Sequence, residues 1–321
     1  MLPASTARLL VSLACRAPSV HNTQPWTWKI DPGGISLYAD ASRQLSLADP
    51  KGRNLMISCG TALHHLQVAA LAHGWSASVS RLPDPADPAR LADVRLNAVN
   101  RPPAASADLR ALQERCTDRR RFTSWPVPDE RLVRLAVTAS EWGGHAVALT
   151  DVSERFQVEL LVGRALHLQA QDLAVADEQR SWAHRRTGDE GVPQASVRKQ
   201  VPADESHRSR FGAGGLDDPA HDVQGGDGLV VLCATDDTPL AWLEVGEGLS
   251  ALWLHAVREG LSVVPLSQVI EVPETRAAFQ LEVLGGLARP LAVIRVGWQA
   301  ISRRQLPRTP RRPVSEILEL T

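Results

Sequence analysis

The chain contains one internal repeat, and this repeat limits its possible folds more than any other feature. Residues 60–79 (GTALHHLQVAALAHGWSASV) and 246–265 (GEGLSALWLHAVREGLSVVP) align without a gap, and leucine or valine recurs at matching positions. Each copy predicts a helix that is apolar on more than one side and that ends at a glycine in the left-handed conformation. Such a helix belongs in a core, so the repeat predicts two halves built alike. The matched glycines are Gly60 with Gly246 and Gly74 with Gly260.

Strand-like runs accompany both helices. VRLNAV at 94–99 and PLAVIRVGW at 290–298 follow the two copies, and the second run is apolar enough to be buried on both faces. VALT at 147–150 and LVVLCAT at 229–235 precede the second copy. Ahead of the first copy, WTWKI and ISLYAD flank the turn signal DPGG, which predicts a hairpin.

Two further helices open the halves. RLLVSLAC at 8–15 has apolar residues at helical spacing, with Ser5 or Thr6 placed as its cap. ERLVRLAVTA at 130–139 predicts the corresponding helix of the second half. Helices and strands of this order are typical of an α+β fold.

The chain is expected to divide near residue 105. VNRPPAASAD at 99–108 has the composition of a linker, so we expect a first half at 1–105 and a second half at 106–321. The segment at about 176–228 fits neither half, because it is polar, rich in Arg, Asp and Gly, and without apolar periodicity. A lid and a plain mobile insertion explain it equally well.

Composition excludes several classes of partner. The 321 residues are 44% hydrophobic and 22% charged, and the formal net charge of -1 gives no field that would attract nucleic acid or a membrane surface. The four cysteines form no C-x-x-C pair, which argues against a disulfide framework and a zinc site. No uninterrupted apolar run reaches membrane-spanning length, and the apolar run near the N-terminus lacks the basic region of a signal peptide. We therefore expect a cytoplasmic protein without a metal.

A glycine pattern in the second repeat helix imitates a dinucleotide fingerprint. Residues 246–251 read G-x-G-x-x-A, but the fingerprint needs its first glycine directly after a strand, and TPLAWLEV at 238–245 reads as the start of the helix itself. This context argues against a nicotinamide-binding domain without flavin. His64 and His65 diverge by about 100° around their helix, so we do not expect them to chelate a metal.

Two basic runs lie near the ends of the second half. ERCTDRRRF at 114–122 sets Arg115, Thr117 and Arg119 close together, and PRTPRRPVSEIL at 307–318 is the second run. A solvated basic patch would explain either run alone. If the runs converge, one phosphate could neutralise several guanidiniums, because arginine offers paired donors that match phosphate oxygens.

Polar side chains crowd the segment between the first helix and the first strand. Amides offer a donor and an acceptor side by side, as the edge of a flat heterocycle with alternating C=O and N–H requires. Trp26 and Trp28 follow on one face of the strand, where we expect them in the core. The polar side chains are those of Ser19, His21, Asn22 and Gln24.

These residues resemble a known family. APSVHNTQPW at 17–26 resembles the A-P-S-x-x-N-x-Q-P-W segment of the FMN-dependent nitroreductases, and RCTDRRRF at 115–122 resembles their R-x-S/T-x-R-x-x-F element. The resemblance covers nearly the whole chain outside 176–228. It implies a nitroreductase-like α+β fold, bound FMN, and transfer of hydride from NAD(P)H through the flavin to a nitro-aromatic or quinone-like acceptor.

The order of the two segments is unusual for that family, where the arginine element comes first. Together with the repeat, it resembles the mycobacterial Acg group, in which two nitroreductase-like halves are fused and one chain mimics the dimer. This resemblance implies an intramolecular pseudo-dimer with one FMN at the interface of the halves and a lid over it. A non-catalytic protein that stores or sequesters FMN remains the alternative.

The resemblance also implies FMN contacts residue by residue, but no catalytic residue. Val20 stands where a serine is common, and Ser267 and Gln268 stand where Glu-Gly is usual. The implied phosphate contacts are Arg115, Thr117, Arg119 and Arg312; the implied flavin contacts are Ser19, Val20, His21, Asn22 and Gln24, with Pro265, Leu266 and Ser267 beside the ring system.

Overall fold

The structure is a computed structural model of the chain and describes residues 2–183, 188–197, 216, 226–298 and 308–320. Its elements follow one another as α1 (Ala4–Ala14), η1 (Val20–Asn22), β1 (Trp26–Asp31), β2 (Gly34–Ala39), η2 (Ala41–Arg43), α2 (Arg53–Ala72), β3 (Trp75–Arg81), β4 (Arg90–Ala98), α3 (Ala105–Glu114), α4 (Asp129–Ser140), β5 (His145–Leu149), α5 (Val152–Gln171), α6 (Leu173–Ala183), η3 (Gln194–Ser196), β6 (Gly228–Ala234), α7 (Pro239–Arg258), β7 (Leu261–Pro265), α8 (Gln268–Glu271), α9 (Pro273–Glu282), β8 (Arg289–Trp298), α10 (Val314–Ile317) and β9 (Leu318–Leu320).

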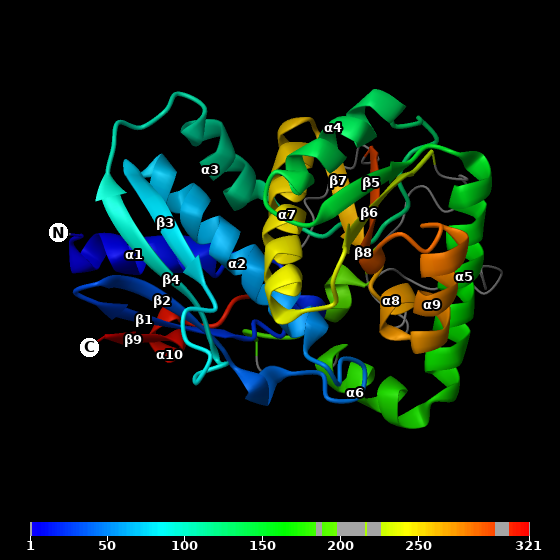
Figure 1. Cartoon of the computed structure of the whole chain (residues 1–321), viewed down its shortest axis with the longest axis horizontal. Coiled ribbons are helices and arrows are strands. Elements are labelled where there is room, and N and C mark those ends of the chain that lie inside the picture. Colours follow the sequence, from blue (N-terminus) through cyan, green and yellow to red (C-terminus); the bar gives the residue numbers. More distant parts are fainter. Residues whose placement is uncertain (1, 184–187, 198–215, 217–225, 299–307, 321) are drawn as a thin grey trace.

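Two sheets stand on either side of a central pair of helices. The five-stranded sheet has the order β3-β4-β2-β1-β9, and the four-stranded sheet has the order β5-β6-β8-β7. Paired strands are antiparallel except β1 and β9, which run parallel where the end of the chain returns to the first sheet. In Figure 1 both termini lie beside that sheet, while α2 and α7 stand between the two sheets. The predicted α+β class is confirmed.

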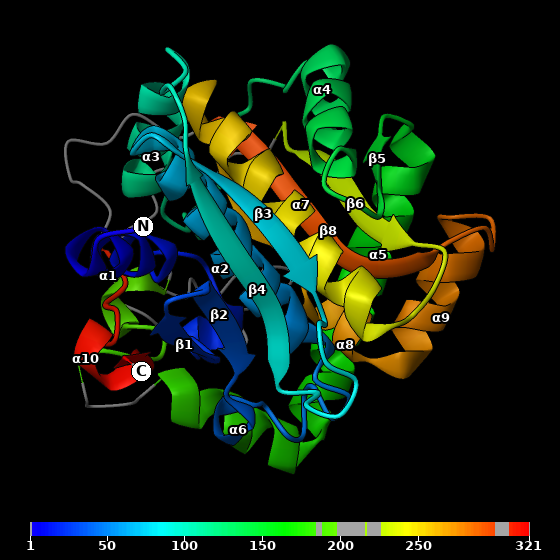
Figure 2. The same cartoon turned by 60° about the vertical axis from the view of Figure 1, so that its left-hand side comes forward.

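The repeated helices α2 and α7 cross at their matched glycines. A Cβ added to Gly60 would overlap the Leu243 carbonyl oxygen and would lie 2.9 Å from the Gly246 Cα, so the two backbones touch. Figure 2 shows the same two helices side by side behind β3 and β4. By length and composition α2 could cross a membrane, but 83% of its apolar stretch is buried inside the protein, as in a core helix. The close approach explains why both copies carry a glycine at this position.

Local sequence signals predicted most of the strands and helix ends. Gly74 and Gly260 have φ of 82° and 77°, as expected for left-handed helix stops. Trp26 and Trp28 are fully buried on one face of β1. The hairpin between β1 and β2 is confirmed, because the Asp31 side chain accepts hydrogen bonds from the next two glycine amides at 2.6 and 3.0 Å.

One local prediction is wrong: Ser5 and Thr6 do not cap α1, because the helix already begins at Ala4 after Pro3. The stretch with linker composition at 99–108 ends in the start of α3, whose buried alanine and leucine side chains give it a packed face. At the start of the segment at 176–228, α6 continues to Ala183 and buries Trp182. Most of that segment lies outside the described residues.

Candidate functional site

The loop of residues 19–24 has a backbone that most sequences avoid. His21, Asn22 and Gln24 have φ of 47°, 56° and 50°, although none of them is a glycine. Their side chains are buried. A left-handed residue other than glycine costs about 1 kcal/mol or more and persists only where its surroundings hold it, and such residues cluster at ligand sites.

The Asn22 side chain ties this loop to two distant segments. Its Nδ2 donates to the carbonyl oxygens of Gly191 at 3.0 Å and Pro310 at 3.1 Å. Its Oδ1 accepts a hydrogen bond from Arg311 Nη1 at 3.0 Å. The amide expected to meet a ligand therefore already binds the inserted segment and the C-terminal tail.

Gln24 is held in the same way. Its Nε2 donates to the Asp189 carbonyl oxygen at 2.8 Å, and its Oε1 accepts from the Arg312 backbone amide at 2.8 Å. The Ser19 hydroxyl accepts from the Gln24 backbone amide at 2.9 Å and closes the loop on itself. The polar side chains of Ser19, Asn22 and Gln24 therefore brace the loop in this conformation.

Three arginines converge beside the loop, and we call Arg16, Arg115 and Arg311 the arginine cluster. Arg115 Nη2 and Arg311 Nη2 both donate to the Arg16 carbonyl oxygen at 3.1 Å. The Nε atoms of all three arginines, and Nη1 of Arg115, are shut off from solvent and have no hydrogen-bond partner. None of the three forms an ion pair with a carboxylate of the described residues. The cluster thus holds positive charge and unused N–H donors together.

Burial and mutual repulsion shift the pKa values in the arginine cluster. Burial, with the charges of Arg311 and Arg16, lowers the pKa of Arg115 to about 9. Burial and the charge of Arg16 lower the pKa of Arg311 to about 10. A nearby anion would offset both the burial and the mutual repulsion of these guanidiniums, so the electrostatics of the cluster favour a bound anion.

The first basic run divides between two environments. The Arg115 guanidinium lies 4.8 Å from the ring centre of Trp253 on α7, inside the cluster. Arg120 instead forms a buried ion pair with Asp118 at 2.8 Å. Thr117 and Arg119 lie on either side of Asp118 and are half-buried.

The C-terminal run also divides between two environments, although its two arginines are adjacent in the sequence. Arg311 joins the cluster, whereas the Arg312 guanidinium lies 3.7 Å from Asp40 and 3.8 Å from Glu316. Sequence reasoning selected Arg312 and missed both Arg311 and Arg16. The available signals were the position of Arg16 directly before the A-P-S segment and the pair of adjacent arginines in the tail.

The first turns of α2 contact both loop 19–24 and α8. Segment 265–267 ends β7 and leads into α8, where Glu271 accepts a hydrogen bond from Asn54 Nδ2 at 3.2 Å. One turn further along α2, the Ser58 hydroxyl accepts from the Val20 backbone amide at 3.1 Å. Loop 19–24 and the helix that follows segment 265–267 therefore lie against the same end of α2.

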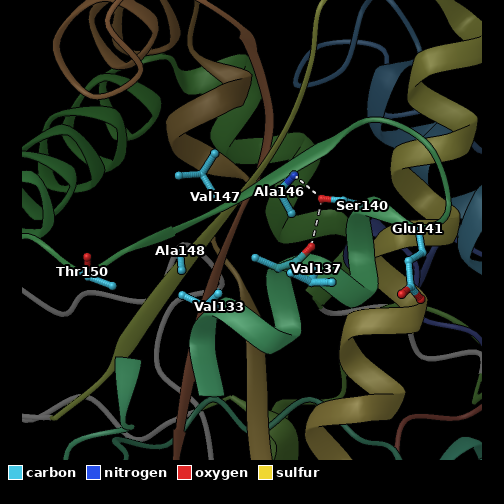
Figure 3. A pocket seen from close by; sticks show the side chains of 9 residues that line it. Val133, Val137, Ser140, Glu141, Ala146, Val147, Ala148 and Thr150 are labelled. Carbon is cyan, nitrogen blue, oxygen red and sulfur yellow. Dashed lines mark hydrogen bonds between the residues drawn. The ribbon is translucent and has the colours of Figure 1, made fainter. Parts of the chain in front are cut away.

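A surface hollow of about 490 Å³ lies elsewhere, between α4 and β5. In Figure 3 the Ser140 hydroxyl is used locally, because it donates to the Ala136 carbonyl oxygen and accepts from the Ala146 amide, each at 3.0 Å. Valine and alanine side chains make up most of its lining. None of the residues predicted to bind a ligand lies in this hollow.

Comparison with known proteins identifies the family. No protein-family model matches the chain. A Mycobacterium tuberculosis protein named "Putative NAD(P)H nitroreductase" is 38% identical over 98% of this chain and 92% of its own length. A second protein of that organism, with the same name followed by "acg", is 32% identical over the whole of this chain and 97% of its own length.

Solved structures of low identity are also similar. A nitroreductase with bound FMN from Desulfitobacterium hafniense is 12% identical over 65% of this chain and 95% of its own, with a TM-score of 0.42. A nitroreductase with bound FMN from Bacteroides fragilis is 13% identical over 62% and 94%, with a TM-score of 0.38. On the strength of the two full-length mycobacterial relatives, the chain belongs to the nitroreductase superfamily, in the Acg-like mycobacterial group.

Proposed function

We propose that this protein binds FMN and is an NAD(P)H-dependent oxidoreductase that reduces a small nitro-aromatic or quinone-like acceptor. The observation that carries the proposal is the arginine cluster, with its buried, unused N–H donors and no carboxylate partner among the described residues. A phosphate monoester supplies the missing charge and three acceptor oxygens. The family of the mycobacterial relatives supports a flavin and a nicotinamide as the ligands.

Each part of the site has a distinct task in this proposal. Arg16, Arg115 and Arg311 hold the phosphate; Thr117 and Arg119 are expected nearer its edge. Loop 19–24 and segment 265–267 would contact the flavin ring system. When bound, FMN supplies the redox chemistry, because its ring system takes hydride from a nicotinamide and passes electrons to an acceptor.

We also propose that the two halves act as an intramolecular pseudo-dimer, with one FMN between them. The crossing of α2 and α7 at matched glycines, with one sheet on each side, supports this arrangement. The expected division at 105 has one exception, because β9 adds to the first sheet. A single chain then needs no second copy to complete the site.

The absorption spectrum of the purified chain, followed by anaerobic titration with NADH and NADPH, tests the proposal. We expect a flavin spectrum that one of the two nicotinamides bleaches, with reoxidation by a nitro-aromatic or a quinone. A chain that binds no FMN would refute the proposal altogether. A chain that holds FMN but is reduced by neither nicotinamide would refute the oxidoreductase and favour the storage protein.

A further inference from the structure

Two adjacent histidines on α2 share one hydroxyl of α7. His64 Nδ1 lies 2.7 Å and His65 Nδ1 lies 2.8 Å from Ser250 Oγ. Although neighbours on a helix diverge by about 100°, both rings reach the same atom. A hydroxyl has one proton and two lone pairs, so Ser250 donates to at most one of the imidazoles and accepts from at least one of them. At least one of the two rings therefore carries its proton on Nδ1.

The surroundings favour one tautomer of His65. The charges of Arg115 and Arg311 act on this ring, and its Nε2 is buried without a hydrogen-bond partner. A proton on Nε2 would be an unpaired donor near those charges, whereas a proton on Nδ1 is accepted by the Ser250 hydroxyl, so the proton on Nδ1 is favoured. This leaves His65 Nε2 as a bare acceptor, buried and without a hydrogen-bond partner.

His65 faces the arginine cluster, whereas His64 faces away from it. Ser250 and Trp253 lie one turn apart on α7. His65 bonds to Ser250 and the Arg115 guanidinium packs on the Trp253 ring, so the two side chains are neighbours. His64 instead packs edge-on against Trp142, with 4.3 Å between ring centres.

The electrostatics agree with this division. Burial, with the charges of Arg115, His64 and Arg311, lowers the pKa of His65 far below its usual value. For His64, burial is the cause of a pKa lowered to about 3. Both rings are therefore neutral at physiological pH, and only His65 is influenced by the cluster.

We propose that His65 is a positioning residue of the phosphate site: its bare Nε2 accepts a hydrogen bond from Arg115 through one water and fixes that guanidinium toward the phosphate. The inference rests on the proposed function. A neutral acceptor suits this position, because a carboxylate there would neutralise Arg115 and compete with the phosphate. Arg115 has the donors to match, since its Nε and Nη1 are buried and unused.

Three variants separate this role from simple packing. An asparagine amide reaches about as far as a histidine Nδ1 and a glutamine amide about as far as Nε2, and both side chains are smaller than histidine. His65→Asn keeps a partner for Ser250 but removes the acceptor, and His65→Gln restores an acceptor. His64→Asn is the matched control, because it perturbs the same hydroxyl on the side away from the cluster. Each variant is titrated with FMN and with riboflavin, which lacks the phosphate.

We expect His65→Asn to weaken FMN binding about tenfold, as the loss of a hydrogen bond to a charged group should, and to leave riboflavin binding within about twofold. His65→Gln should recover most of the FMN affinity, and His64→Asn should match the unmodified chain. Equal losses for both ligands in His65→Asn, or equal FMN losses in the two asparagine variants, would overturn the inference.

A measurement on the unmodified chain covers the case of a variant that does not fold. In the FMN-loaded protein, long-range ¹⁵N–¹H spectra should show a neutral His65 with its proton on Nδ1. The ¹⁵N chemical shift of Nε2 should be that of an unprotonated nitrogen that accepts a hydrogen bond. A proton on Nε2 would overturn the inference while leaving FMN binding intact. If the unmodified chain binds no flavin, the proposed function itself fails.

Discussion

Replacing Arg115 with methionine should stabilise the flavin-free chain while destroying its affinity for FMN. Burial, with the charges of Arg311 and Arg16, lowers the pKa of Arg115 to about 9, a decrease of roughly three to four pKa units. Each pKa unit corresponds to about 1.4 kcal/mol, so the protonated Arg115 side chain destabilises the folded state by about 5 kcal/mol at neutral pH. The unfolded chain binds the proton more tightly, so this cost declines only as the pH rises above about 9.

Two favourable contacts are lost with the guanidinium. Its position 4.8 Å from the Trp253 ring centre is worth about 1 kcal/mol. Its 3.1 Å hydrogen bond to the Arg16 carbonyl is worth about 1 kcal/mol, and that carbonyl keeps its bond from Arg311. Methionine retains the unbranched apolar stem, so we expect a net gain of about 3 kcal/mol in the free energy of unfolding.

Urea unfolding of the flavin-free chain, followed by tryptophan fluorescence, measures the gain, and FMN titration measures the lost affinity. Arg312→Met is the matched control: Arg312 lies near Asp40 and Glu316, so its loss should not stabilise the chain. The reasoning is refuted if Arg115→Met unfolds at lower urea than the unmodified chain, or if it still binds FMN at the original strength.

Four further changes have expected outcomes. Arg311→Met should weaken FMN binding at least tenfold, and more than it weakens riboflavin binding, because it removes one of the three phosphate donors; titration of both ligands checks this. Gly246→Ala should lower the free energy of unfolding by about 3 kcal/mol, because its methyl group would overlap the Ile57 carbonyl at the helix crossing, and urea unfolding measures the loss. Glu247→Gln should cost about 3 kcal/mol in the same assay, because this fully buried carboxylate accepts hydrogen bonds from Arg81 at 2.6 and 3.1 Å. Burial raises the pKa of Asp49 to about 6, so the folded state binds its proton more tightly and this group makes the chain less stable as the pH rises from about 4 to 6; Asp49→Asn should remove that decline from a pH series of unfolding curves.

The parts of the fold that follow local rules could be predicted from the sequence. The hairpin of β1 and β2 follows from a turn signal between alternating runs, and the ends of α2 and α7 follow from Gly74 and Gly260. The start of α3 inside an apparent linker could not be predicted, because its buried face is defined by α2 and α7 rather than by its own composition. Tertiary packing overrode a local signal there.

The candidate site shows the same limit at single residues. The sequence places two arginines side by side in the tail, but only the tertiary structure turns Arg311 toward the cluster and Arg312 toward carboxylates. The amides of Asn22 and Gln24 were expected to face a ligand, and in this conformation they hold the inserted segment and the tail. A residue pattern specifies which groups gather in a region and leaves open which group each side chain meets.

The centre of the molecule shows where the two repeated helices agree and where they differ. Gly60 and Gly246 stay alike, because a side chain on either helix would separate the two backbones. Four residues further on, the matched positions differ: His64 forms a hydrogen bond with Ser250, whereas identical helices would place the same residue at both positions. Because the second half carries serine there, the neighbouring His65 gains a hydroxyl acceptor on one side and the arginine cluster on the other. Divergence at the crossing thus places a neutral imidazole between a serine hydroxyl and the arginine cluster.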